Sequence, residues 1–250
     1  MSQPVPLYTG ERLFQTKVAM ALTRDDVLHD RIRKRLRDEA ENGADHQLLS
    51  EEEFEASRAD ILSQFNGHEE LWIFGYGSLI WSPTFEFVEQ AVAHLPDHAR
   101  KFCLWAPSGR GSPEQPGLWL ALDDAERGHS CTGVAFRIDN AVREHELLML
   151  WRREMVSGAY QPRVIAVEIQ GALKPCVCLL ANKSHPRYTG PLSAQTIVSS
   201  IAMADGHLGS CREYLYKLVD GLNKLDVDDA DLNLLVEQVR QYRIHRSLAE

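Results

Sequence analysis

The pattern of apolar and charged positions changes near residue 70. Before that point, apolar residues are spaced among many charges, as expected for helices with one buried face. Between residues 23 and 41 the apolar positions are Val27, Leu28, Ile32 and Leu36. This spacing predicts one amphipathic helix over residues 23–41, with Thr23 and Asp26 forming its N-terminal cap and Gly43 ending it.

A second helix is predicted to begin after Ser50. Ser50 and Glu53 have the spacing of a capping box, in which each side chain accepts a hydrogen bond from the other residue's backbone N–H. We expect this helix to run to about Phe65 and to end at Gly67. The sequence therefore predicts a helical extension over residues 1–69, followed by one main domain over residues 70–250.

From Leu71 onward, short apolar runs predict strands. The first run, Leu71-Trp72-Ile73-Phe74, leads directly into a turn that contains two glycines. The other predicted strands cover residues 101–106, 118–122, 131–138, 163–169 and 176–180. Helices are predicted over residues 141–155, 193–205, 210–222 and 228–242. Because the strands mostly precede the helices, we expect an α+β fold, built on a small, mostly antiparallel sheet or barrel.

Composition excludes several classes of partner. The chain has 250 residues and a formal net charge of -9, and it has no dense tract of lysine and arginine. A nucleic-acid partner is therefore not expected. No apolar run approaches the roughly 20 residues that cross a bilayer, and residues 1–10 lack the pattern of a signal peptide. We therefore expect a cytoplasmic protein without a membrane partner, and the sequence leaves its oligomeric state open.

Neither a disulfide framework nor a metal site is predicted. The five cysteines are odd in number and scattered, at Cys103, Cys131, Cys176, Cys178 and Cys211. Cys176 and Cys178 are two apart on a predicted strand, so we expect both to be packed side chains on one face. His94 and His98 are four apart, but Pro96 between them opposes a shared helix face, and there is no HExxH motif.

The turn after the first predicted strand has two interpretations. It begins as Gly75-x-Gly77, like a dinucleotide-binding fingerprint, but Ile80 stands where the third glycine belongs and no Walker lysine follows. Ser78 does not lie in a G-x-S-x-G nucleophile elbow. The turn is either a plain tight turn or a nest of backbone N–H groups that binds a carboxylate or a developing oxyanion.

Glu154 is the candidate acid or base. It lies near the end of the helix predicted over residues 141–155, four residues after Leu150 and three after Trp151. Its side chain is therefore expected beside the apolar face of that helix. A carboxylate that is partly shielded from water is suited to proton transfer. The alternative is an ordinary surface glutamate that pairs with Arg152 or Arg153.

Five segments between residues 70 and 242 carry a further pattern. They are Phe74-Gly75-Tyr76-Gly77-Ser78-Leu79-Ile80-Trp81, Arg110-Gly111-Ser112-Pro113-Glu114-Gln115-Pro116-Gly117, Gly133-Val134-Ala135-Phe136, Arg153-Glu154-Met155 followed by Tyr160, and Glu213-Tyr214-Leu215. In this order they resemble the γ-glutamylcyclotransferases of the ChaC type. Agreement of several motifs at once is far more specific than any one of them, and residues 1–69 lie outside the resemblance.

The resemblance implies a fold, a reaction and a site. It implies a compact mixed barrel with flanking helices, and a lyase that needs no metal and no cofactor. It implies that the enzyme cleaves glutathione to 5-oxoproline and cysteinyl-glycine, through attack of the substrate's own α-amine, with Glu154 as the general acid and base. The implied substrate-binding residues are Gly75, Tyr76, Gly77, Ser78, Leu79, Arg110 and Tyr160. The alternatives are a cyclotransferase for other γ-glutamyl amines or dipeptides, and a γ-glutamyl-binding module without catalysis.

The chain departs from the family pattern near the expected pocket wall. Ser112 stands where threonine is usual, and Gly109 replaces a histidine that often precedes this loop. Cys211 lies in a stretch where many members carry asparagine. The prediction of the substrate depends on these positions more than the prediction of the reaction does.

Overall fold

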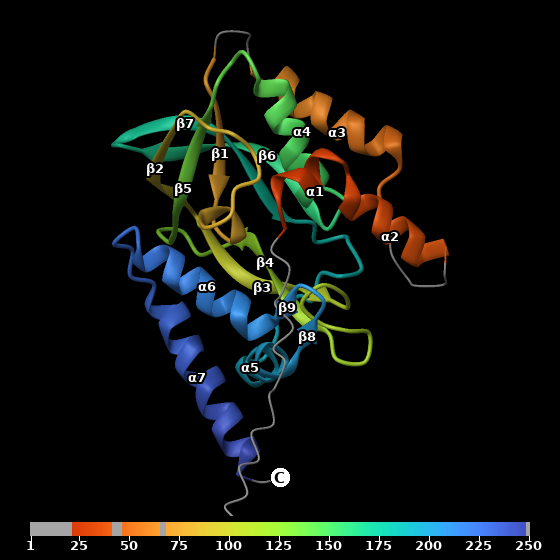
Figure 1. The fold of residues 1–250 in the computed structure, drawn as a ribbon. Coiled ribbons are helices and arrows are strands. Elements are labelled where there is room, and N and C mark those ends of the chain that lie inside the picture. The colour runs from red at the N-terminus through yellow and green to blue at the C-terminus, as the bar shows by residue number, and fades with distance from the viewer. Residues whose placement is uncertain (1–21, 42–46, 66–68, 249–250) are drawn as a thin grey trace, which may run out of the picture.

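The computed structural model describes residues 22–41, 47–65 and 69–248. Its centre is a closed ring of five strands with helices on the outside, which confirms the predicted mixed barrel (Figure 1). In ring order the strands are β1 (Leu71–Gly75), β5 (Ser130–Ile138), β2 (Glu89–Pro96), β6 (Tyr160–Ile169) and β7 (Ala172–Ala181). Four neighbouring pairs run antiparallel, and the ring closes through a parallel pairing of β1 with β7.

The strand β1 leads from the core of the barrel into the two-glycine turn. All of its residues are buried, as a continuous apolar run predicts for a strand that is covered on both faces. After Gly77 the turn continues into η1 (Ser78–Ile80), a single turn of 3-10 helix. The buried strand therefore fixes the point at which this turn leaves the barrel.

Two more strands extend the sheet beyond the ring. β3 (His98–Ala106) and β4 (Gly117–Asp124) form a hairpin, and β4 pairs in parallel with β7 at Leu122 and Leu180. β1 uses the same edge of β7 at an earlier position, opposite Cys176 and Val177. The hairpin therefore continues the sheet past the end of β1, and its connecting loop carries the Arg110 segment.

The main-domain helices form two groups. α4 (Arg143–Glu154) lies on the same side of the barrel as the N-terminal helices. α5 (Ala194–Met203), α6 (Cys211–Asn223) and α7 (Ala230–Ser247) gather below the barrel in Figure 1. A short hairpin of β8 (Asp205–Gly206) and β9 (Gly209–Ser210) joins α5 to α6.

The N-terminal helices are α1 (Arg24–Leu28), α2 (Arg31–Glu41) and α3 (Glu51–Ser63). Both predicted capping boxes are confirmed, at Thr23 with Asp26 and at Ser50 with Glu53. The predicted single helix over residues 23–41 is wrong, because the chain turns after α1 and Asp30 has a φ of 50°. That left-handed backbone cannot continue an α-helix. The predicted helix ends at Gly43 and Gly67 lie outside the described residues.

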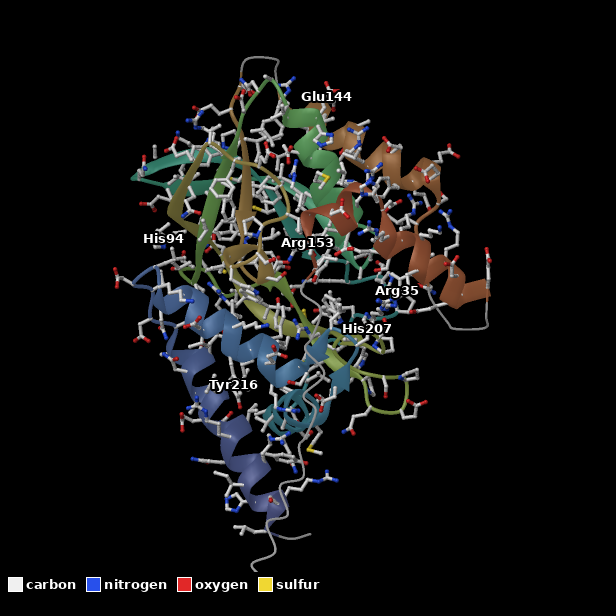
Figure 2. The ribbon with its side chains drawn as sticks, in the orientation of Figure 1. Arg35, His94, Glu144, Arg153, His207 and Tyr216 are labelled. Carbon is white, nitrogen blue, oxygen red and sulfur yellow. The ribbon has the colours of Figure 1, made fainter. Side chains whose placement is uncertain are left out.

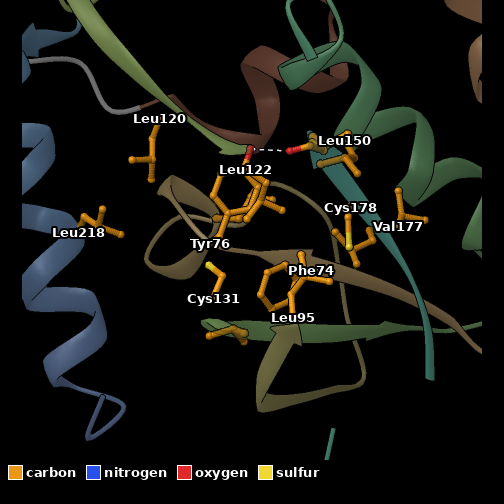
Figure 3. Close-up of a cluster of buried hydrophobic side chains, with 14 of the residues drawn as sticks. Phe74, Tyr76, Leu95, Leu120, Leu122, Cys131, Leu150, Val177, Cys178 and Leu218 are labelled. Carbon is orange, nitrogen blue, oxygen red and sulfur yellow. Dashed lines mark hydrogen bonds between the residues drawn. The ribbon is translucent and has the colours of Figure 1, made fainter. Parts of the chain in front are cut away.

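The N-terminal helices share the hydrophobic core of the barrel. Their buried contributions are Val27, Phe54, Ile61 and Phe65. Full burial of such a side chain is typically worth about 1.5–3 kcal/mol, so these contacts hold the helices firmly against the main domain. Figure 3 shows part of the same core inside the barrel, where Phe74 and Tyr76 lie near Cys131 and Cys178. All five cysteines are buried and unpaired, and Cys176 and Cys178 are packed as predicted.

The strand β2 was not predicted from the sequence. Only Ala93 and Leu95 of its side chains are buried, and it contains His94 and ends at Pro96. Its apolar signal is therefore weak, although the register places it between β5 and β6. Partners supplied by the rest of the barrel, rather than local preference, make this segment a strand.

Candidate active site

Glu154 is the last residue of α4, and its position follows from the burial of that helix. Leu147, Leu150 and Trp151 are fully buried and anchor one face of α4. Glu154 lies on the same side, three residues after Trp151, and its side chain is only 13% exposed. Met155 caps the helix, and Gly158 turns the chain with a φ of 72°. The carboxylate is therefore held at the end of a rigid helix and largely away from water.

Arg153 joins Glu154 to the two-glycine turn. Its Nε lies 2.7 Å from Oε1 of Glu154, and its Nη2 donates a 2.7 Å hydrogen bond to Oγ of Ser78. Its Nη1 donates to the carbonyl oxygen of Ser82. Arg153 is itself only 7% exposed, and Figure 2 shows it near the centre of the molecule. One guanidinium thus brings together two segments that are far apart in the sequence.

Two buried tyrosines, Tyr76 and Tyr214, and the partly buried Tyr160 lie near this pair of charges. Tyr76 donates to the carbonyl oxygen of Leu179 at 2.7 Å, and Tyr160 donates to that of Leu120 at 2.9 Å. Tyr214 lies over Gly77, since a Cβ added to Gly77 would stand 2.7 Å from the tyrosine hydroxyl oxygen. The absence of a side chain at Gly77 is therefore what allows Tyr214 to reach the turn.

Burial is the main reason that the pKa of each of these tyrosines is raised, and the negative charge of Glu154 adds to it in all three. The backbone N–H of Ser78 partly offsets the rise in the pKa of Tyr214. A phenol with a raised pKa stays protonated at neutral pH, so it can donate a hydrogen bond but does not act as a base. Among these neighbours, Glu154 is therefore the group suited to accept a proton.

Arg110 lies on the other side of Tyr214. Its guanidinium carbon is 5.7 Å from the centroid of the Tyr214 ring, and its Nη1 lies 3.7 Å from Oε2 of Glu213. Nη1 also donates to the carbonyl oxygen of Ser210 at 3.3 Å. Burial lowers the pKa of Arg110, although a guanidinium remains charged at neutral pH. A buried cation next to the Tyr214 ring is suited to bind a carboxylate.

The loop before Arg110 explains one departure from the family pattern. Gly109 has a φ of 77°, a conformation that favours glycine, and a Cβ there would lie 3.0 Å from the ring of Trp119. Gly206 of the β8–β9 hairpin packs directly against Gly109, and the N–H of Leu208 donates to the Gly109 carbonyl at 2.8 Å. The two short segments fit together through their backbones and leave no room for a histidine in this conformation.

Cys211, the other departure, faces the barrel. Its thiol donates to the carbonyl oxygen of Leu118 at 3.2 Å and accepts from the Leu118 N–H at 3.5 Å. Burial raises the pKa of this thiol to about 11, so it stays neutral. The contact holds the start of α6 against β4 and points to a structural use of the side chain.

The structure thus brings most of the predicted site residues together. Tyr76, Gly77, Ser78, Tyr160 and Glu154 form one polar cluster, and Arg110 joins it through Tyr214. The side chain of Leu79 lies in the hydrophobic core, and Gly75 packs against Phe136. At these two positions, only the backbone is available to a ligand. Sequence reasoning did not assign a role to Tyr214, although its segment was part of the recognised pattern.

Two surface hollows lie elsewhere. They measure about 300 and 330 Å³, and Tyr242 of α7 lines both of them. Neither is lined by Glu154 or by the two-glycine turn. Polar contacts, rather than cavity size, therefore identify the candidate site.

Within the described residues, no group of three His, Cys, Asp or Glu side chains is placed to hold a metal ion. In this same part of the chain, no helix has the length and apolarity needed to span a membrane.

Comparison with known proteins gives a family match. The sequence model of the family described as ChaC-like protein matches residues 71–242. A glutathione-specific γ-glutamylcyclotransferase of Escherichia coli is 38% identical over 195 residues, which are 78% of this chain and 83% of the relative. A Danio rerio protein, glutathione-specific γ-glutamylcyclotransferase 1, is 37% identical over 172 residues, 66% of this chain and 87% of the relative.

A solved structure supports the fold. The crystal structure of a yeast γ-glutamyl cyclotransferase specific to glutathione superposes with a TM-score of 0.64, at 21% sequence identity. The match covers 71% of this chain and 99% of the yeast chain. The strands, the site segments and the sequence relatives agree, and this chain belongs to the ChaC-like protein family.

Proposed function

We propose that this protein is a γ-glutamylcyclotransferase that cleaves glutathione to 5-oxoproline and cysteinyl-glycine. The observation that carries the proposal is the largely buried Glu154 carboxylate, which Arg153 ties to Ser78 in the two-glycine turn. The names of the E. coli and Danio rerio relatives support glutathione as the substrate. The five buried, unpaired cysteines fit a reducing compartment, and we place the enzyme in the cytoplasm.

The reaction is an intramolecular transfer of an acyl group. The α-amine of the glutamyl residue attacks its own γ-carbonyl carbon, a five-membered ring closes, and the bond to the cysteinyl nitrogen breaks. Because the nucleophile belongs to the substrate, the protein has to hold the substrate curled and to move a proton. Well-oriented intramolecular reactions reach effective molarities of about 10⁵ M or more, so positioning supplies much of the rate.

We assign the proton transfer to Glu154. The carboxylate takes a proton from the attacking amine and then gives it to the departing cysteinyl nitrogen, which leaves as an amine. Such general acid–base catalysis typically contributes about 10²–10⁴-fold. Arg153 holds Oε1 of Glu154, and we assign the other carboxylate oxygen to the substrate amine.

The remaining groups are assigned to binding. The Tyr214 hydroxyl lies beside Gly77 in the turn of residues 75–79, and the charge of Glu154 acts on it. N–H groups at the start of a helical turn have no partner inside it, so this hydroxyl and these N–H groups are candidate substrate contacts. We assign them to the glutamyl carboxylate or to the oxyanion, and Arg110 to a carboxylate of the substrate. The Tyr160 hydroxyl already donates a hydrogen bond to the carbonyl oxygen of Leu120, so we assign Tyr160 to the wall of the site beside Glu154.

The first experiment incubates the purified protein with glutathione and measures 5-oxoproline directly. We expect release by the wild type and loss of release by Glu154→Gln. Glu144→Gln is the matched control, because Glu144 lies on the same helix but is exposed to solvent (Figure 2). Full activity of a folded Glu154→Gln variant would refute the assignment.

A substrate panel tests the alternatives. If the wild type leaves glutathione intact but cyclises other γ-glutamyl amines or dipeptides, the reaction stands and the substrate is wrong. If no γ-glutamyl compound gives 5-oxoproline while glutathione still binds, the protein is a binding module. Gly109 and Cys211, which depart from the family pattern, lie beside Arg110. Because they bear on the choice of substrate, the panel is measured together with the first experiment.

A further inference from the structure

The N-terminal helices contact the chain immediately before Glu154. The indole Nε1 of Trp151 donates to Oγ of Ser57 in α3 at 2.9 Å. Nη1 of Arg152 donates to the carbonyl oxygen of Leu28, at the end of α1, at 2.7 Å. Two successive residues next to Glu154 are therefore held by two different helices of the extension.

The extension also contacts the chain just after Glu154. The N–H of Leu49 donates to the carbonyl oxygen of Val156 at 3.0 Å. The Leu49 side chain covers Gly158, where a Cβ would stand 2.8 Å from its Cδ2 atom. Leu49 thus packs into the bend that ends α4, and Glu154 lies between two sets of contacts with the extension.

Leu49 is itself fixed by a buried arginine. Arg33 of α2 is 3% exposed, and its Nη2 donates to the carbonyl oxygen of Leu49 at 2.9 Å. Its guanidinium carbon lies 4.7 Å from the centre of the Phe54 ring, and its Nη1 is 3.0 Å from Oε2 of Glu51. The segment before α3 is therefore rigidly attached to α2 and α3.

A second brace lies two turns earlier on α4. Glu146 has a side chain only 2% exposed, and Arg24 of α1 binds both of its carboxylate oxygens at 2.8 Å. The N–H of Glu86 donates to the same carboxylate at 2.7 Å, and Arg24 also donates to the carbonyl oxygen of Thr84. Arg24 therefore ties α4 to the segment around residues 82–86, and that segment holds Arg153 through Ser82.

We propose that the N-terminal extension is a positioning element for Glu154, with Leu49 and Arg24 as its two fixed points. Leu49 sets the bend that follows the carboxylate, and Arg24 sets α4 against the segment that holds Arg153. The family match begins at residue 71, so Leu49 and Arg24 lie outside it, whereas their partners on and after α4 lie inside it. The proposal rests on the proposed role of Glu154. A displacement of about 1 Å at a reacting group can cost on the order of 10²-fold in rate, so such braces have a direct effect on turnover.

The test is Leu49→Ala, compared with Leu49→Met and with Glu52→Gln, an exposed residue of α3. Leu49→Ala leaves the substrate contacts in place, so we expect kcat to fall by about tenfold or more while KM changes by less than about twofold. Leu49→Met refills the space over Gly158 and is expected to restore kcat. Glu52→Gln should match the wild type in both constants.

A second readout separates positioning from stability. The NMR resonance of the Arg153 Nε–H group, assigned with Arg153→Lys, reports the ion pair with Glu154 without any substrate. We expect this resonance to shift in Leu49→Ala and to return in Leu49→Met. A Leu49→Ala variant that melts at a lower temperature but keeps the wild-type kcat and the wild-type resonance would overturn the proposal. If the wild type releases no 5-oxoproline, the proposed function fails, and the resonance still decides the positioning claim.

If Leu49→Ala does not fold, the Arg24 brace carries the test. The double variant Arg24→Met with Glu146→Leu removes the link without leaving a buried charge, an exchange that proteins often tolerate. We expect the same fall in kcat and the same shift of the Arg153 resonance. Wild-type values for both in the folded double variant would contradict the proposed role of Arg24.

Discussion

The two sides of the candidate site are held by different kinds of contact. On the glutamate side, the end of α4 with Arg153 and Glu154, charged side chains make the connections. On the arginine side, the loop of Gly109 and Arg110 packs against the β8–β9 hairpin mainly through backbone atoms and glycines. On the glutamate side, a charged side chain can therefore be replaced while the backbone stays in place. On the arginine side, the packing requires glycines, so an added side chain would displace the backbone.

Glu154→Gln should have the largest effect. The amide keeps the size of the side chain but cannot accept the amine proton, so kcat should fall by about 10²–10⁴-fold. KM should change much less, because Arg110 and the turn are untouched. Steady-state kinetics of 5-oxoproline release measure both constants. A large rise in KM with kcat preserved would place Glu154 in binding and not in proton transfer.

Gly77→Ala tests the contact between the turn and Tyr214. The new methyl group would stand 2.7 Å from the Tyr214 hydroxyl oxygen, so the turn or the ring has to move. We expect kcat/KM to fall by about 10–100-fold, since misplaced binding groups lose that much. Tyr214→Phe removes the clashing atom but also a binding hydroxyl, so Gly77→Ala should cost less in the Tyr214→Phe background than in the wild type. An equal cost in both backgrounds would show that the clash is not the cause.

Gly109→His tests the arginine side by restoring the residue that is usual in the family. A side chain at a φ of 77° costs about 1–2 kcal/mol, and the ring of Trp119 crowds it further. We therefore expect a lower free energy of unfolding in urea and a higher KM, with kcat little changed. Gly128→Ala is the control for strain alone, because Gly128 has a φ of 96° but nothing within 4 Å of its Cβ position. If both variants lose the same free energy of unfolding, crowding by Trp119 is not the cause.

The smallest effect concerns pH. Burial raises the pKa of Glu146, but hydrogen bonds from Arg24 and from the Glu86 N–H, together with the charge of Arg24, outweigh it and leave the pKa below its usual value. A lowered pKa stabilises the folded state at pH values above the ordinary glutamate pKa, and this stability is lost as the pH falls through the lowered value. Urea unfolding should therefore show a smaller loss of stability between pH 7 and acid in Arg24→Met with Glu146→Leu than in the wild type. An identical pH dependence would show that other carboxylates dominate.

The local part of the site could be predicted from the sequence. The spacing of Glu154 from Leu150 and Trp151 placed it beside the buried face of its helix, because helical periodicity alone determines that side. The two capping boxes were predictable for the same reason, since each joins residues three apart. The α+β barrel followed from the order of the elements and from the family resemblance.

Contacts between distant segments could not be predicted in this way. Arg153 and Ser78 are 75 residues apart, and Arg24 and Glu146 are 122 apart, so no local pattern joins them. The break between α1 and α2 depends on one residue, Asp30, whose backbone conformation the helical spacing did not reveal. The contact of Tyr214 with the turn depends on Gly77, which is on another element and has no side chain that would indicate the contact in the sequence.

The closure of the barrel also has a consequence for synthesis of the chain. β1 is made early, yet its partner β7 ends only at Ala181, and the ring closes when Trp72 meets Cys176. Until then, one edge of a wholly apolar strand has unpaired backbone groups, and such an edge readily joins another chain. A nascent chain released before Ala181 is therefore expected to aggregate, and late, long-range pairing of this kind is slow. The enzyme's yield in a cell thus depends on how well β1 is protected while the middle of the chain is being translated.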